Sequence, residues 1–418
     1  MFVFWQQAYF LCYISIVVWF RGAESSLLSQ SKIKEIRQTN GTARSRLVFY
    51  LKDEIFAPFT TTHVLHSDNG ARRSSFVHNF SLPLFSTMSS FTVNSINVSN
   101  LGDVEQVSEG NYTGNRHLRR IPDVADKQSV LSFARMAASA YAADESSDDW
   151  VDVDAPWNRS LGIGWDFDGV RGQVFVETTG SVIVIALKGT TTILARKGDR
   201  TDTYQNDKIN DNLLFSCCCG RVSYKWTTVC DCYLKNTYTC SQTCLARELR
   251  SKDKYYEASL RVFHDVAKLY PTSSIWLTGH SLGASLSSLI AQTHGLPALV
   301  FGAPGEKLAA SRLHLPTWLH PDSEKYIWHF GNTADPVFMG TCNGPLSACA
   351  IGGYAMESQC HSGLECVYDT VADKGFEMSL IYHRIAKIIE IIEEYERPAE
   401  CSKPMSCQDC YLWNFIRD

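Results

Sequence analysis

The sequence predicts an α/β fold with a mostly parallel central sheet over residues 126–400. Three observations predict it. Apolar runs with strand character alternate with amphipathic runs at helical spacing. One strand-like run, VIVIAL at 182–187, is wholly apolar, which is typical of a strand buried on both faces. A third run leads directly into a serine between two glycines, in WLTGHSLGAS at 276–285.

The first elements of this region follow from local patterns. Residues 129–143, SVLSFARMAASAYAA, combine good helix formers with apolar residues at helical spacing, which predicts a helix. Residues 172–192, GQVFVETTGSVIVIALKGTTT, hold two β-rich runs parted by Thr-Thr-Gly, which predicts a hairpin or two sheet strands. A helix is expected at 254–270, and Pro271 ends it.

The alternation continues through the second half of the region. SIWLTG at 274–279 predicts a strand, and the next residues to 294 predict a helix. Residues 298–304 and 325–332 are strand candidates that each run into glycine. The isoleucines of 383–395, HRIAKIIEIIEEY, recur at i, i+3, i+4 and i+7, which predicts an amphipathic helix. Strands and helices that alternate at this spacing indicate βαβ units.

The first 20 residues, MFVFWQQAYFLCYISIVVWF, contain no charged side chain. About 20 apolar residues in a helix cross the hydrocarbon core of a bilayer. We therefore expect an uncleaved transmembrane signal-anchor at 1–20; a signal peptide cleaved near Ala23-Glu24-Ser25 is the alternative. Residues 21–125 are rich in Ser, Asn, Thr and Arg, and we expect them to form a glycosylated lumenal region.

Two features place the rest of the chain in a lumen, against the distribution of basic residues. Lys and Arg follow the span and do not precede it, which would leave the C-terminal bulk in the cytosol. However, 14 of the 15 cysteines, all but Cys12, lie beyond the span, and this even number suits disulfides in an oxidising compartment. N-x-S/T sequons point the same way. We expect a single-pass type II protein with 21–418 in the lumen, glycosylated at Asn40, Asn79, Asn97, Asn111 and Asn158.

Seven cysteines lie in the segment 217–244, which we expect to be a disulfide-rich insertion. Zinc binding is the alternative, but C-x2-C pairs do not recur there and three adjacent thiols suit disulfides better. In the C-terminal tail, 401–418, Cys407 and Cys410 form a C-x2-C, for which a redox role would need a thioredoxin-like unit around it. We therefore expect no metal and no other cofactor.

The charge balance excludes one class of partner. The net charge is -5, the pI is about 6.2, and no long basic tract is present. A nucleic-acid binder would show a basic face or stripe. We therefore expect no nucleic-acid partner.

The stretch Gly279-His280-Ser281-Leu282-Gly283 is a G-x-S-x-G motif between a predicted strand and a predicted helix. This is the context of the nucleophile elbow of an α/β-hydrolase. The tight turn admits only glycine at the flanking positions and holds the serine at the carboxyl end of the sheet, above a helix N-terminus. Ser281 is the predicted nucleophile; the alternative is a serine in an ordinary glycine-rich turn.

A serine hydroxyl needs a base and an orienting acid, which in α/β-hydrolases follow in the order Ser, Asp/Glu, His. Asp335 comes immediately after the strand candidate 325–332 and is the predicted acid. Three other aspartates compete. The first precedes that strand and the others lie in a cysteine-bounded loop or just after it: Asp322, Asp369 and Asp373.

Two histidines lie beyond Asp335. His361 adjoins Cys360 in an expected disulfide loop, where a surface role is favoured. His383 begins the helical pattern at 383–395 and is the predicted base; a structural histidine is the alternative.

The oxyanion hole needs two donors aimed at the developing negative oxygen. One is expected to be the backbone N–H of Leu282, directly after the nucleophile. The other is expected from the turn Lys188-Gly189-Thr190, where Thr190 offers its N–H and could add a hydroxyl.

Together, KGTTT, GHSLGAS, NTADPV, HRI and the CCCG…CDCYL segment resemble the fungal class 3 lipases, and within them the autophagy-related vacuolar lipases. The resemblance covers nearly the whole chain. It implies an esterase that acts on phospholipids and triacylglycerols, travels from the endoplasmic reticulum and Golgi through endosomes, and lyses autophagic and multivesicular bodies in the vacuole. By matching motif it gives the nucleophile role to Ser281, the acid to Asp335, the base to His383 and an oxyanion role to Thr190. Several members carry longer Ser/Thr-rich tails, whose function does not transfer.

A membrane anchor suits lipid substrates, because tethering raises the local concentration of enzyme at the membrane. Lipases usually shield the site with a lid, which we look for between Thr190 and Cys217. Two other functions fit the same residues: another serine hydrolase, such as a thioesterase or peptidase, and a catalytically inert glycosylated membrane protein that uses the core for binding. Labelling of Ser281 by a fluorophosphonate separates the inert protein from the enzymes.

Overall fold

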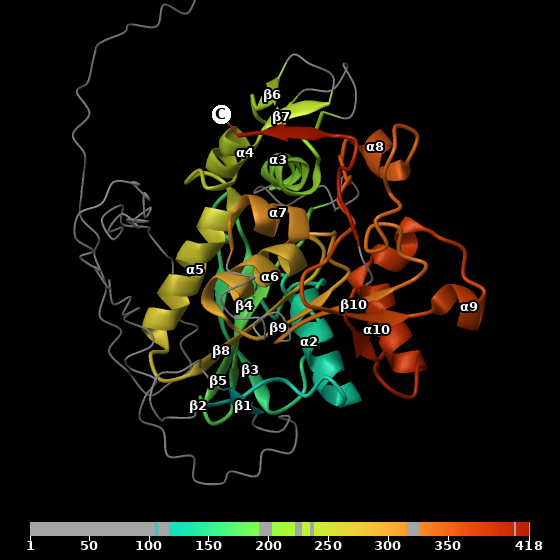
Figure 1. Ribbon diagram of the computed structural model, residues 1–418. Coiled ribbons are helices and arrows are strands. Elements are labelled where there is room, and N and C mark those ends of the chain that lie inside the picture. Colours follow the sequence, from blue (N-terminus) through green and yellow to red (C-terminus); the bar gives the residue numbers. More distant parts are fainter. Residues whose placement is uncertain are drawn as a thin grey trace, which may run out of the picture. The chain divides into compact units, whose positions relative to one another are not determined.

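The computed structural model describes residues 105–107, 117–191, 203–221, 228–234, 238–315, 326–404 and 407–417 (Figure 1). The expected signal-anchor at 1–20 and the sequons Asn40, Asn79, Asn97 and Asn111 lie outside these residues. Within the described ranges, no helix is long and apolar enough to cross a bilayer.

Each helix and strand predicted between 129 and 395 is present, and the structure adds others that the sequence patterns did not predict. The helices are α2 (Lys127–Ser139), α3 (Tyr204–Phe215), α4 (Gln242–Leu249), α5 (Tyr255–Leu269), α6 (Leu282–His294), α7 (Lys307–Arg312), α8 (Ala348–Gly352), α9 (Thr370–Lys374), the 3-10 turn η2 (Leu380–His383) and α10 (Ile385–Glu394). The strands are β1 (Glu105–Val107), β2 (His117–Arg119), β3 (Trp157–Ile163), β4 (Gly172–Glu177), β5 (Val182–Leu187), β6 (Tyr233–Leu234), β7 (Thr239–Ser241), β8 (Ser274–Gly279), β9 (Ala298–Phe301), β10 (Ile327–Asn332), β11 (Leu364–Tyr368), β12 (Cys401–Ser402) and β13 (Asn414–Ile416).

The central sheet has eight strands in the order β12-β11-β10-β9-β8-β5-β4-β3. Strands β5, β8, β9, β10 and β11 run parallel, which confirms the predicted mostly parallel sheet. Antiparallel strands close both edges, with β4 and β3 at one side and β12 at the other. The expected hairpin at 172–192 is therefore the antiparallel pair β4 and β5.

The parallel strands bring their carboxyl ends to one edge of the sheet. Leu187 at the end of β5 pairs with Gly279 at the end of β8, and His280 bridges to Phe301 at the end of β9. Phe301 in turn pairs with Phe330 of β10. Ligand and catalytic groups of open α/β sheets gather at this edge, so the side chains that follow these strands are brought together.

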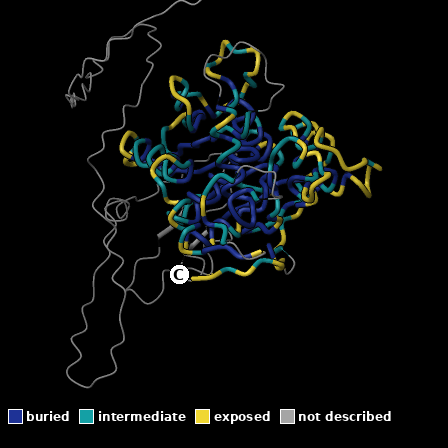
Figure 2. The backbone as a smooth tube through the Cα atoms, turned by 90° about the horizontal axis from the view of Figure 1, so that it is seen from above, coloured by how far each residue is buried: buried dark blue, intermediate teal, exposed yellow. Residues whose placement is uncertain are grey.

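Alternate residues of the strands enter two apolar cores, one on each face of the sheet. Ile183 and Ile185 of β5 pack with α5 and α6, whereas Val182 and Val184 pack with α2 and α10. All four side chains have 0% exposure, as the wholly apolar run predicts. Figure 2 shows the buried segments gathered at the centre of the described chain, with exposed segments at the periphery.

The cysteine-rich segment forms a small lobe of its own. β6 and β7 make a three-stranded sheet with β13, and Figure 1 shows β13 beside β7, close to α4. The 14 cysteines from 217 onward are all paired, which confirms the expected disulfides: Cys217–Cys410, Cys218–Cys240, Cys219–Cys230, Cys232–Cys244, Cys342–Cys349, Cys360–Cys407 and Cys366–Cys401.

The segment 401–418, expected as a separate tail, is built into both sheets. β12 pairs with β11 at the edge of the central sheet, and β13 pairs with β7 of the cysteine-rich lobe. Cys407 and Cys410 bond to Cys360 and Cys217, not to each other, so they do not form a C-x2-C redox pair.

Candidate active site

Ser281 lies in a strained turn between β8 and α6. Its φ of 55° and ψ of -124° are unusual for a residue with a side chain. A Cβ at Gly279 would lie 2.6 Å from the main chain of Gly283, and a Cβ at Gly283 would lie 2.2 Å from the Leu187 carbonyl oxygen. Only glycine fits at either position, which explains the G-x-S-x-G spacing.

The structure brings the three predicted triad residues together. His383 Nε2 lies 2.9 Å from Ser281 Oγ, and His383 Nδ1 lies 2.8 Å from Asp335 Oδ2. Ser281 is 7% exposed, Asp335 is fully buried, and the His383 side chain is 17% exposed. This is the nucleophile, base and acid geometry of a serine hydrolase.

Main-chain donors fix the orientation of Asp335. Its Oδ1 accepts hydrogen bonds from the N–H groups of Val337 at 2.8 Å and Phe338 at 3.3 Å. Its Oδ2 is left to face His383 Nδ1. The two carboxylate oxygens therefore have separate tasks, one anchored to the loop and one holding the imidazole.

His383 is the last residue of η2, and one residue, Arg384, separates it from α10. The amphipathic pattern places it at the start of the helix, but the helix itself begins at Ile385. Asn332, at the end of β10, donates from Nδ2 to the Tyr382 carbonyl at 3.2 Å. The acid strand and the base segment are thereby joined beside the triad.

The two predicted oxyanion residues lie at the start of α6 and after β5. Leu282 is the first residue of α6, so its N–H has no carbonyl partner within the helix. The Thr190 hydroxyl donates to Asp211 Oδ2 at 2.7 Å, so this proton is directed at Asp211 and not at a substrate oxygen. The N–H of Thr190 is the group left for the oxyanion hole.

Asp211, which sequence reasoning missed, lies on α3 below the Thr190 turn. It has 0% exposure, and burial raises the pKa of its carboxyl to about 8. Its neighbour Asp207 accepts from the Thr191 N–H at 2.7 Å and from the Tyr255 hydroxyl at 2.8 Å. Two buried carboxyls therefore hold the oxyanion turn. The polar residues of the α3 sequence are the signal from which this supporting role could have been predicted.

The lid expected between Thr190 and Cys217 stays a prediction. The described part of that region is α3, which has seven buried residues of its own, Asp211 among them, and supports the oxyanion turn. Residues 192–202 lie outside the described chain.

A half-buried tyrosine and a buried histidine beside the triad were also missed. The Tyr141 hydroxyl lies 2.7 Å from His280 Nδ1, and His280 Nε2 lies 2.6 Å from the His383 carbonyl oxygen. Burial lowers the pKa of His280 to about 3, so the ring is neutral. His280 stands at a variable position of the G-x-S-x-G motif, where nothing marks it in the sequence.

The expected glycosylation site Asn158 lies on β3, at the edge of the central sheet, and is exposed. It is the one sequon among the described residues. Its exposure leaves the side chain accessible for modification.

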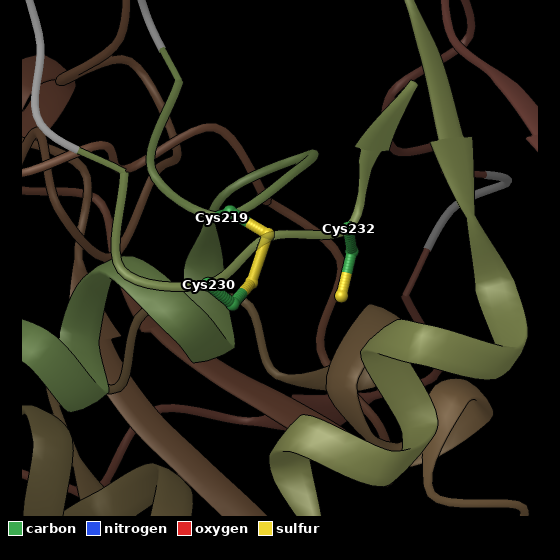
Figure 3. A group of neighbouring side chains, drawn as sticks. All are labelled: Cys219, Cys230 and Cys232. Atoms are coloured by element: carbon green, nitrogen blue, oxygen red, sulfur yellow. A yellow bond between two sulfur atoms is a disulfide. The ribbon is translucent and has the colours of Figure 1, made fainter.

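Among the described residues, the cysteine sulfurs that lie close enough together for a metal belong to disulfides. Figure 3 shows the Cys219–Cys230 disulfide with the Cys232 sulfur beside it. Cys232 is itself bonded to Cys244. Metal ligation requires thiolates, so these sulfurs offer none while the disulfides are intact.

His361 is 2% exposed, so the expected surface role is wrong. Its Nδ1 lies 3.0 Å from Glu365 Oε1 and its Nε2 lies 2.9 Å from the Ala303 carbonyl oxygen. Two acceptors require two N–H donors, so His361 is an imidazolium. Burial opposes this charge, but Glu365 and Glu306 raise the pKa of His361. With both nitrogens protonated, His361 is not a ligand in the group that it forms with Glu306 and His329.

Comparison with known proteins gives consistent matches. A family model described as "Lipase (class 3)" matches residues 184–294. A Candida glabrata protein named "Putative lipase ATG15" is 52% identical over 301 residues, covering 71% of this chain and 60% of the relative. The Yarrowia lipolytica protein of that name is 53% identical over 300 residues, covering 71% and 54%.

The chain therefore spans less than two thirds of the length of these two relatives. Among solved structures, a lipase from Rhizopus microsporus var. chinensis is 12% identical with a TM-score of 0.33, covering 62% of this chain and 85% of that chain.

Proposed function

The chain belongs to the class 3 lipase family, and from this premise we propose that it is a serine ester hydrolase acting on lipids. The observation that carries the proposal is the chain of two hydrogen bonds from Asp335 through His383 to Ser281. The elbow presents Ser281 at the carboxyl edge of the sheet, next to the N-terminus of α6.

The reaction follows from this geometry. Ser281 Oγ attacks the ester carbonyl carbon while His383 Nε2 takes the hydroxyl proton, and Asp335 stabilises the resulting imidazolium. The N–H groups of Leu282 and Thr190 stabilise the oxygen that becomes negative. The ester C–O bond then breaks and the alcohol leaves with the proton from His383. Water, deprotonated by His383, cleaves the acyl-enzyme and releases the fatty acid.

Phospholipids and triacylglycerols are the proposed substrates, and lysis of autophagic and multivesicular body membranes in the vacuole is the proposed role. The motif resemblance and the relatives' names support the substrate class and the role in autophagy. The proposed location is that of a type II protein, carried through the endoplasmic reticulum, Golgi and endosomes to the vacuole. Seven disulfides support an oxidising lumen, and the apolar segment 1–20 supports the anchor.

The test is release of fatty acid from phosphatidylserine and triacylglycerol vesicles by the purified 418-residue chain. Ser281→Ala is expected to lower turnover by about a million-fold, as loss of a triad nucleophile commonly does. Ser285→Ala is the matched control, because it removes a buried hydroxyl of α6 that donates to the Pro304 carbonyl. It is expected to keep wild-type turnover.

Three results separate the alternatives. Ser281-dependent release of fatty acid supports the lipase. Labelling of Ser281 by a fluorophosphonate without lipid hydrolysis would indicate a thioesterase or peptidase. A folded chain that neither labels nor hydrolyses lipid would indicate the binding protein.

A further inference from the structure

Two side chains outside the triad, the half-buried Tyr141 and the buried His280, connect three parts of the active site. Tyr141 follows α2, and His280 precedes the nucleophile in the elbow. We propose that they are positioning residues, which hold the main chain of His383 and the oxyanion turn in register with Ser281. This inference rests on the proposed ester hydrolase function.

The direction of each hydrogen bond is fixed by chemistry. The His383 carbonyl only accepts, so the contact of 2.6 Å requires a proton on His280 Nε2. Burial keeps the ring neutral by lowering the pKa of His280 to about 3, so Nδ1 carries a lone pair. Nδ1 therefore accepts from the Tyr141 hydroxyl at 2.7 Å. His280 has one tautomer and one orientation that satisfy both contacts.

The Tyr141 hydroxyl has a second contact, on the oxyanion side. It lies against Gly189, the residue before Thr190 in the oxyanion turn. The fit is close, because a Cβ at Gly189 would lie 2.2 Å from the Tyr141 hydroxyl and 3.1 Å from Ser281 Cβ. A single hydroxyl thus contacts the oxyanion turn and, through His280, the base.

The contact with His383 matters because the segment that carries this base is short. η2 is one turn of four residues, and its Leu380 and Ile381 are exposed. Besides His280, it is held near the triad by the bond from Asn332 to the Tyr382 carbonyl, by stacking of Tyr382 on Phe376, and by the bond from the Ser379 N–H to the Ala334 carbonyl just before it. Without the His280 contact, His383 can move away from Ser281. A displacement of about 1 Å costs on the order of 100-fold in rate.

The first test compares two variants of His280 in the purified 418-residue chain, assayed on a soluble p-nitrophenyl ester. His280→Leu removes the donor to His383 and is expected to lower kcat about 10- to 100-fold, with KM within about twofold of wild type. His280→Gln places an amide N–H near the position of Nε2 and is expected to recover most of the loss. Loss in both variants to the same extent would overturn the role of this donor.

The second test compares two tyrosines, each of which loses one hydrogen-bonded hydroxyl on substitution by phenylalanine. Tyr141→Phe removes the shared hydroxyl, and Tyr256→Phe removes a hydroxyl of a buried residue that bonds to Thr293 Oγ1 at 2.9 Å, between α5 and α6. Both are expected to lower Tm by similar amounts, but only Tyr141→Phe is expected to lower kcat, by about tenfold.

Coupling between the two residues completes the test. If Tyr141 acts partly through His280, the kcat loss of Tyr141→Phe with His280→Leu is smaller than the product of the single losses. A loss equal to that product would overturn the connection.

Wild-type kcat in Tyr141→Phe and both His280 variants, with only Tm lowered, would reduce the pair to a structural contact. Should His280→Leu fail to fold, Tyr141→Phe and His280→Gln still decide the question. An inactive wild type that does not label at Ser281 would instead overturn the proposed hydrolase function, which keeps the two failures distinct.

Discussion

The nucleophile elbow and the cysteine-rich lobe are held in place by different physical means. At the elbow, Gly279 and Gly283 let α6 approach β5 so closely that a Cβ at either would overlap main-chain atoms. In the lobe, the fully buried apolar residues are one leucine and disulfide-bonded cysteines, with partly buried apolar residues packed against them: Leu245, Cys218, Cys219, Cys232 and Cys240, and around them Val229, Cys230, Tyr233, Cys244, Trp413 and Phe415. A core this small gives a lobe little stability by itself, and disulfides add to it. Catalysis needs exact contact distances at the elbow, whereas the lobe needs only to stay attached.

The helix α3 joins the two regions. Its Asp211 holds the oxyanion turn through Thr190, and Phe215 at its end leads into Cys217 through a single residue. Substitutions in the lobe, the elbow and α3 therefore separate effects on stability from effects on the geometry of the active site.

The largest effect on stability is expected from the disulfide between Cys217 and Cys410, which closes a sequence separation of 193 residues. Replacing both cysteines by serine is expected to cost about 2–5 kcal/mol of unfolding free energy, because the unfolded chain gains freedom. Turnover per folded molecule is expected to stay at the wild-type value. Urea unfolding and active-site labelling measure the two quantities.

The matched control removes Cys342–Cys349, which closes a separation of only 7 residues. Its loss is expected to cost less, because a short loop restricts the unfolded chain less. Equal costs for the two disulfides would contradict this account of the lobe.

A smaller loss of stability, but a loss of activity as well, is expected from Gly283→Ala. The new Cβ would meet the Leu187 carbonyl oxygen at 2.2 Å, so β5 and α6 must separate. Overpacking of this kind costs about 1–3 kcal/mol. Thermal unfolding and ester hydrolysis measure the two effects.

Gly169→Ala is the control for this substitution, since a Cβ there meets nothing within 4 Å. It is expected to change stability by less than about 0.5 kcal/mol. Wild-type turnover in Gly283→Ala would show that the elbow tolerates a wider spacing than we infer.

The smallest effect is a change in pH dependence from Asp211→Asn. Burial raises the pKa of Asp211 to about 8, above its unfolded value of about 4. The neutral carboxyl therefore stabilises the fold fully below about pH 4, and this contribution is lost as the pH rises through about 8. Asparagine does not titrate and keeps an oxygen for the Thr190 hydroxyl.

Between about pH 5 and pH 8 we expect the wild-type Tm to fall by a few degrees more than the Tm of the variant. Thermal unfolding across this range measures the difference. Parallel Tm profiles would show that Asp211 keeps one charge state throughout.

Local patterns were sufficient to predict most of the core. Alternating strands and helices, and the apolar run of β5, predicted the parallel sheet, because burial on two faces leaves a direct record in the sequence. Ser281, Asp335 and His383 were predicted in the same way, since each follows a strand or precedes a helix at the edge where such groups gather.

Contacts between distant residues left no such record. Tyr141 and His280 are 139 positions apart, and the G-x-S-x-G motif around His280 leaves its own position variable. His361 was expected at the surface because it adjoins a cysteine, yet the disulfide of Cys360 lies against the core. The pairing of the cysteines and the addition of β12 to the central sheet likewise depend on the folded arrangement.

The separation between Cys217 and Cys410 also determines when their disulfide can form during synthesis. Ribosomes add roughly 5–20 residues per second, so about 10–40 s separate the synthesis of the two cysteines. During that interval the native partner of Cys217 does not exist, while Cys218 and Cys219 are next to it in the sequence. The native pair can form only after Cys410 has been made, and any earlier disulfide of Cys217 must first be exchanged for it.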